Sequence, residues 1–115
     1  MTEELMGIIT PLLVGVLLIV IGAVNMTGNI SSLHSYHRTN VTEENRKPFG
    51  KRVGLGNIII GIGVVALSGA MYLTQRFEND VFTFIGMAIM AVTLVIGLAI
   101  SFTAMKKYNG GIFRF

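Results

Sequence analysis

The stretch Val53-Gly-Leu-Gly-Asn-Ile-Ile-Ile-Gly-Ile-Gly-Val-Val-Ala-Leu-Ser-Gly-Ala-Met-Tyr-Leu-Thr74 decides the fold, because it runs for 22 residues without a charged side chain. Two uncharged stretches of similar length flank it, at residues 5–25 and 81–105. A helix needs roughly 20 apolar residues to cross about 30 Å of hydrocarbon. The sequence therefore predicts an all-α integral membrane bundle of three transmembrane helices that forms one domain over residues 1–115.

The composition agrees with a membrane protein that carries no soluble domain. Hydrophobic residues make up 52% of the chain and charged residues 13%, whereas a soluble domain has about 25% charged residues. Cysteine is absent, which excludes disulfides and thiolate metal sites. The acidic start, with Glu3 and Glu4, differs from the basic start of a cleaved signal peptide.

The positive charges predict the orientation in the membrane. Eight of the nine Lys and Arg residues lie in the first loop, residues 26–52, or in the basic tail, residues 106–115. Only Arg76 lies in the short hairpin at residues 75–80. Because Lys and Arg near membrane segments prefer the cytoplasm, we expect an outer N-terminus, a cytoplasmic loop and a cytoplasmic C-terminus. The net charge of +3 then matches anionic lipid headgroups, and we expect no nucleic-acid partner.

The loop at residues 26–52 is expected to contain short helices at the membrane interface. Ile30, Leu33 and His37 share a helical face. Thr42 is a suitable N-cap for a second short helix, which we expect Pro48 and Gly50 to end after about one and a half turns.

This loop is also the most chemically specific part of the chain, and it is the predicted partner surface. The residues concerned are Ile30, Leu33, His34, Tyr36, His37, Arg38, Glu43, Glu44, Pro48, Phe49 and Lys51. The alternative is that the loop only anchors the protein at the membrane interface.

Small residues recur every seven positions in the second transmembrane stretch. Such a period produces a groove along one face of a helix and allows close helix contact. The residues predicted to pack in this way are Gly54, Gly61 and Ser68 in one row, Gly56, Gly63 and Ala70 in another, and Gly97 and Ser101 in the third stretch. The sequence leaves open whether these rows pack within one chain or between subunits.

Titratable residues give little support for catalysis, metal binding or ion transport. His34 and His37 are one helical turn apart, but a zinc site needs three or four ligands, so we expect no metal, no cofactor and no enzyme activity. No Asp, Glu, Lys, Arg or His lies within a transmembrane stretch, which argues against ion-coupled transport. Asn57 is the strongest polar group there, and we expect it to form a hydrogen bond between helices.

The first loop and its flanks resemble a known family. The residues that carry the resemblance are Gly28-Asn-Ile-Ser-Ser-Leu-His-Ser-Tyr-His-Arg38, Val41-Thr-Glu-Glu-Asn45, Pro48-Phe-Gly-Lys51 and Gly54-Leu-Gly56. They resemble a family of small bacterial integral membrane proteins, mainly from Gram-positive species. The resemblance covers about residues 15–65 and implies three helices and a bacterial plasma membrane, but no activity.

A more distant similarity is to membrane immunity proteins that protect a producer from its own peptide toxin. Arg38-Thr39 and the acidic pair after a membrane span carry it, although the aromatic residue after that pair is missing. The sequence therefore favours an accessory, regulatory or immunity-type protein that acts through contacts with lipid, with another membrane protein or with itself. The alternative is a homo-oligomeric channel or small transporter.

Overall fold

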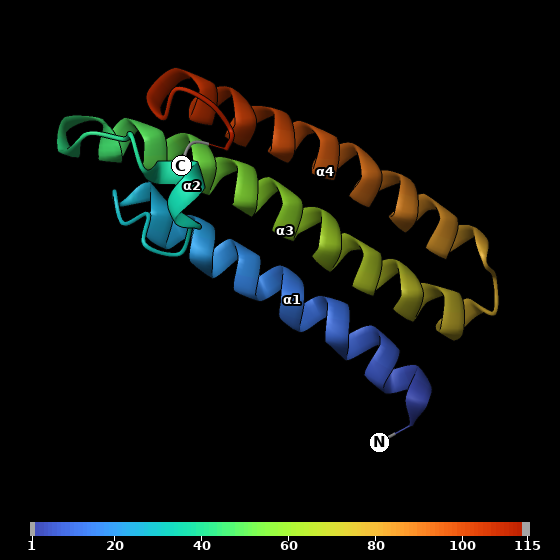
Figure 1. Ribbon diagram of the computed structural model, residues 1–115. Helices are drawn as coiled ribbons and strands as arrows, with labels where there is room; N and C mark the ends of the chain where they lie inside the picture. The colour runs from blue at the N-terminus through green and yellow to red at the C-terminus, as the bar shows by residue number, and fades with distance from the viewer. Residues whose placement is uncertain (1, 114–115) are drawn as a thin grey trace.

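The computed structural model describes residues 2–113, and the prediction of an all-α fold with three long apolar helices is confirmed. In chain order the elements are α1 (Glu3–Met26), α2 (Ser35–Arg38), the 3-10 turn η1 (Glu43–Asn45), α3 (Arg46–Phe77) and α4 (Val81–Tyr108). The helix α3 runs between α1 and α4 and packs along both of them (Figure 1). The central helix therefore holds the fold together.

Each of the three long helices is long and apolar enough to cross a membrane. Their outer faces carry large exposed apolar side chains, such as Leu13, Phe84 and Val95, which are between 63% and 67% exposed. In water this surface would be unfavourable, whereas in a bilayer lipid chains cover it. The chain is therefore a multi-pass membrane protein.

One row of small residues on α3 packs against α1. Gly61 faces Gly15, and Gly54 faces Gly22, so closely that a Cβ on Gly61 would stand 2.7 Å from the Gly15 carbonyl oxygen. One further step of seven residues along α3, Ser68 donates a hydrogen bond to the carbonyl oxygen of Ile8 (2.6 Å). The row therefore follows α1 in the opposite direction over most of its length.

The other row of small residues on α3 packs against α4. A Cβ on Gly97 would stand 2.6 Å from the Gly56 carbonyl oxygen. Farther along, Gly63 lies against Thr93, and Ala70 lies against Gly86. Both predicted rows thus lie between helices of the same chain, on two sides of α3.

Polar side chains add hydrogen bonds between the helices. Asn57 donates to the side-chain oxygen of Asn25 (2.9 Å), which confirms the expected bond from α3 to a neighbouring helix. At the opposite end, the hydroxyl groups of Thr74 and Thr83 lie 2.7 Å apart and join α3 to α4. Such bonds contribute roughly 0.5–2 kcal/mol each in a membrane.

The helices extend beyond the apolar stretches, and the first loop is correspondingly shorter than predicted. The 32 residues of α3 begin at Arg46, so the connection from α1 is residues 27–45. The prediction that Pro48 and Gly50 end a short helix is wrong, because both lie inside α3. Pro48 is tolerated because the first N–H groups of a helix have no acceptor within that helix.

The hairpin between α3 and α4 is a tight turn. Glu78 ends α3 in the left-handed conformation, with φ of 52°. The side-chain oxygen of Asn79 accepts a hydrogen bond from the backbone N–H of Val81 (3.0 Å) and so satisfies the first N–H group of α4. This geometry explains why so few residues can reverse the chain.

Replacement of the contact glycine Gly61 by alanine is expected to weaken the packing of α1 on α3. The added methyl group would collide with the backbone of Gly15, and such overpacking costs about 1–3 kcal/mol. Gly69 is the matched control, because a Cβ there meets no atom within 4 Å. Denaturant unfolding in mixed micelles should show a loss of stability for Gly61→Ala and none for Gly69→Ala. Equal stabilities would contradict the assignment.

Candidate functional site

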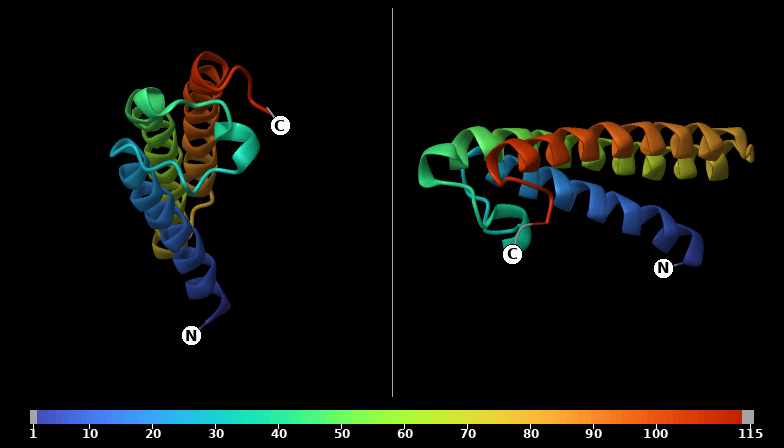
Figure 2. Two further views of the ribbon diagram at one scale, coloured as in Figure 1. Left: turned by 60° about the vertical axis from the view of Figure 1, so that its left-hand side comes forward. Right: turned by 45° about the horizontal axis from the view of Figure 1, so that its top comes forward.

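The connection between α1 and α3 meets the segment that follows α4 at one end of the three helices (Figure 2). We call residues 27–45 and 109–113 the end cap. The helix α2 lies within the connection from α1 to α3, and the chain after α4 turns back toward it. The loop predicted to carry the partner surface is thus folded onto the helices.

Asn109 is fully buried and ties the two parts of the end cap together. Its side-chain oxygen accepts a hydrogen bond from the backbone N–H of Asn40 (2.7 Å). Its amide group donates to the backbone oxygens of Tyr36 (2.9 Å) and Gly111 (3.1 Å). One side chain therefore satisfies three backbone groups from two distant segments.

Asn25 joins the start of the end cap to the helices at the end of α1. It is fully buried, and its amide group donates to the backbone oxygen of Asn29 and the hydroxyl of Ser32, both at 3.0 Å. Its side-chain oxygen accepts the bond from Asn57 of α3. The start of the end cap is therefore fixed to two transmembrane helices.

An apolar cluster lies beneath these hydrogen bonds. Ile30 and Val41 of the loop are buried against Phe49 and Val53 of α3 and against Met105 of α4. Phe49 is fully buried, and its ring meets that of Tyr108 edge-on with 6.2 Å between centroids. Burial of these side chains stabilises the end cap by about 1.5–3 kcal/mol for each large residue.

Four ring side chains form a patch on the outer side of the end cap. His34 stacks on Tyr36 with 5.1 Å between centroids, and Tyr36 meets His37 edge-on at 4.3 Å. Phe113 of the tail lies 5.3 Å from Tyr36 and 5.2 Å from His37, and it is 63% exposed. We call His34, Tyr36, His37 and Phe113 the aromatic patch.

The imidazole of His37 links α2 to the tail. Its Nδ1 lies 2.6 Å from the carbonyl oxygen of Ile112. Because a carbonyl oxygen only accepts hydrogen bonds, Nδ1 is the donor and carries a proton. Nothing in residues 2–113 brings three or more His, Cys, Asp or Glu side chains together, and the rings of His34 and His37 stand 6.4 Å apart.

The predicted partner-surface residues occupy different environments. Those that lie on the surface of the end cap or half-buried within it are Leu33, His34, Tyr36, His37, Arg38, Glu43 and Glu44. Arg38 also donates from Nε to the backbone oxygen of Leu33 (3.0 Å). Pro48 and Lys51 belong to the first turns of α3. Phe49 and Ile30 are buried, so in this structure neither side chain lies on the surface of the end cap.

Sequence reasoning missed Asn109 and Asn40, which join the two parts of the end cap. The only local signal is the Asn109-Gly-Gly111 sequence, which is typical of a turn. Turn propensity does not reveal that the amide of Asn109 reaches a segment 69 residues earlier in the chain. Arg114 and Phe115 of the predicted basic tail lie outside the described residues.

Replacement of Asn109 by alanine is expected to loosen the end cap and leave the three long helices intact. Each buried backbone group that loses its partner costs about 1–3 kcal/mol. Hydrogen exchange read by mass spectrometry should therefore become faster at residues 36–40 and 110–113, but not within α3. Asn45→Ala is the control, because the side chain of Asn45 forms no capping hydrogen bond. Unchanged exchange in Asn109→Ala would show that the end cap does not depend on this residue.

Comparison with known protein families, with curated proteins and with solved structures finds no match for this chain.

Proposed function

We propose that this chain is a non-catalytic accessory protein of a bacterial plasma membrane, which binds another membrane protein through its end cap. Immunity to a peptide toxin is one form that such binding takes. The proposal rests on one observation. Hydrogen bonds from Asn109 and Asn25 hold the end cap on the helices, and the end cap carries the aromatic patch. The proposal extends the interpretation reached from the loop sequence.

A surface whose backbone is already fixed is suited to binding, because little conformational entropy is lost when a partner binds. Association costs roughly 0.5–1.5 kcal/mol for each side chain that must be immobilised. The buried amides of Asn25, at the end of α1, and of Asn109 already hold the backbone of the end cap. Tyr36 and Phe113 are held in ring contacts with their neighbours, which lowers the remaining cost.

The chemistry of the patch also favours a protein partner. Aromatic residues are enriched at the centres of protein interfaces, where they provide much of the binding energy. The exposed carboxylates of Glu43 and Glu44 lie in the turn before α3. A partner that covers the patch with apolar groups and offers basic groups toward these carboxylates would complement the surface.

The proposed orientation places the end cap in the cytoplasm. It rests on the eight Lys and Arg residues in the sequence segments 26–52 and 106–115, against Arg76 alone in the hairpin. The part of the partner membrane protein that meets the end cap is then its cytoplasmic part.

Photo-crosslinking in cells tests the proposed binding. A photoreactive residue at the exposed position His34 is expected to capture one reproducible foreign protein, identified by mass spectrometry. The same probe at Glu78, in the hairpin at the far end of the helices, is the matched control. Capture of the same set of proteins from both positions would count against a specific surface. Adducts with further copies of this chain alone would replace the proposal by a homo-oligomer.

Single cysteine residues test the proposed orientation, because the natural chain has none. Thr42→Cys places a thiol on the end cap, and Asp80→Cys places one in the hairpin; both positions are exposed. In intact cells an impermeant maleimide is expected to label Asp80→Cys, and Thr42→Cys only after the membrane is permeabilised. The reverse pattern would place the end cap outside the cell.

A further inference from the structure

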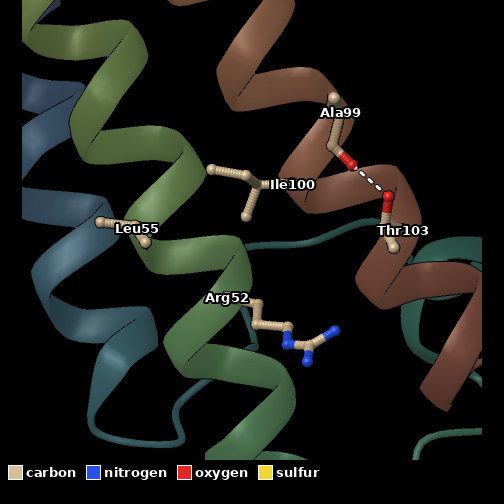
Figure 3. Close-up of a pocket in the computed structure, with 5 residues that line it drawn as sticks. All are labelled: Arg52, Leu55, Ala99, Ile100 and Thr103. Carbon is tan, nitrogen blue, oxygen red and sulfur yellow. Dashed lines mark hydrogen bonds between the residues drawn. The ribbon is translucent and has the colours of Figure 1, made fainter.

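A groove of about 390 Å³ opens between α3 and α4, near the end of the helices that carries the end cap (Figure 3). Arg52 and Leu55 line it from α3, and Ala99, Ile100 and Thr103 line it from α4. Sites that bind small ligands measure about 300–1,000 Å³. The groove is therefore large enough to hold part of a lipid molecule.

The hydrogen-bonding groups in the groove are few. The hydroxyl of Thr103 donates to the backbone oxygen of Ala99 (2.6 Å), so its proton is already used. Leu55, Ala99 and Ile100 contribute apolar side chains. Among residues 2–113, no carboxylate forms an ion pair with Arg52, whose charged group instead lies over an aromatic ring. A ligand in the groove would thus meet an apolar wall and one cationic donor.

A second cation lies over the same aromatic ring as Arg52. The guanidinium carbon of Arg52 is 5.9 Å from the centre of the Tyr108 ring, and the Lys107 ammonium is 5.2 Å from the same centre. One ring therefore gathers two positive charges from α3 and α4. Two positive charges around one ring raise the local positive potential, which favours the binding of an anion.

We propose that this groove binds one anionic phospholipid from the leaflet on the end-cap side of the membrane. The phosphate accepts hydrogen bonds from the Arg52 guanidinium, whose planar fork matches phosphate oxygens. The positive charge of Lys107 adds attraction for the same headgroup. An acyl chain lies along Leu55, Ala99 and Ile100, and basic pockets between transmembrane helices bind anionic headgroups in this manner.

The apolar wall favours a lipid over a free phosphate ion. A phosphate ion alone would leave Leu55, Ala99 and Ile100 uncovered, whereas a phospholipid covers them with its own chain. The inference is independent of the proposed protein partner, because Arg52 and Thr103 belong to the transmembrane helices and not to the end cap.

Native mass spectrometry of the full chain in detergent tests the site. Phosphatidylglycerol and phosphatidylcholine with identical acyl chains are titrated in parallel, and the wild-type chain is expected to retain phosphatidylglycerol preferentially. Arg52→Gln should lower the affinity for phosphatidylglycerol about tenfold, as expected for the loss of one charge-assisted contact. Arg76→Gln is the matched control, since Arg76 lies on the same helix and also faces a ring, that of Phe77 at 5.5 Å. Equal retention by Arg52→Gln and the wild-type chain would overturn the proposal.

A second variant separates the contribution of the apolar groove to lipid binding from that of the Arg52 charge. Ala99→Phe fills the groove and keeps Arg52, and it is expected to reduce phosphatidylglycerol retention as well. Glycerol phosphate, which has the headgroup chemistry without acyl chains, should not displace the lipid. Displacement by glycerol phosphate, or unchanged retention in Ala99→Phe, would show that the charged group binds phosphate without the groove. Ala99 and Arg52 are exposed, and thermal unfolding of each variant checks that the fold is retained.

Discussion

The close approach of the α3 backbone to both of its neighbours is the constraint on which the rest of the structure depends. A transmembrane helix gains little from burying apolar side chains against another helix, because lipid chains are equally apolar. Dispersion contacts and hydrogen bonds must hold the helices together instead, and both need short distances. Gly54 and Gly61 provide these distances toward α1, and Gly56 and Gly63 provide them toward α4.

The same closeness makes the end cap possible. Gly50 lies so near the end of α1 that a Cβ would collide with the carbonyl oxygen of Asn25. With the two helices at this distance, the side chain of Asn25 reaches Asn57 on one side and the start of the loop on the other. The loop is thereby directed toward the end of α4, where Asn109 binds it. Packing inside the membrane and order outside it are therefore parts of one arrangement.

The two proposed binding regions lie at the same end of the molecule and differ in the side chains that they offer to a ligand. The aromatic patch lies on the end cap and offers rings with a few polar atoms, which suits a protein. The groove lies between transmembrane helices and combines an apolar wall with the positive charge of Arg52, which suits a lipid. A bound anionic lipid would also neutralise positive charge close to Tyr108, whose ring packs on Phe49 under the end cap.

The sequence by itself determined the membrane environment, the number of long helices and the faces on which α3 packs. Backbone groups in the hydrocarbon must all be hydrogen-bonded, so an uncharged stretch of sufficient length folds as a transmembrane helix. Small residues at a period of seven then mark the faces on which that helix packs. The hydrogen bond of Asn57 was predictable because a polar side chain in the membrane needs a partner, although the identity of that partner, Asn25, was not.

Only the tertiary structure decided what becomes of the first loop. Local signals placed a helix end at Pro48 and put Phe49 on the surface, but in the structure α3 begins before both residues, and Phe49 is buried under the loop. The contacts responsible join Asn40 to Asn109 and His37 to Ile112, residues that are 69 and 75 positions apart. Periodicity and turn propensity report on neighbours within a few residues, whereas these contacts exist only once the helices have brought the ends of α1 and α4 together.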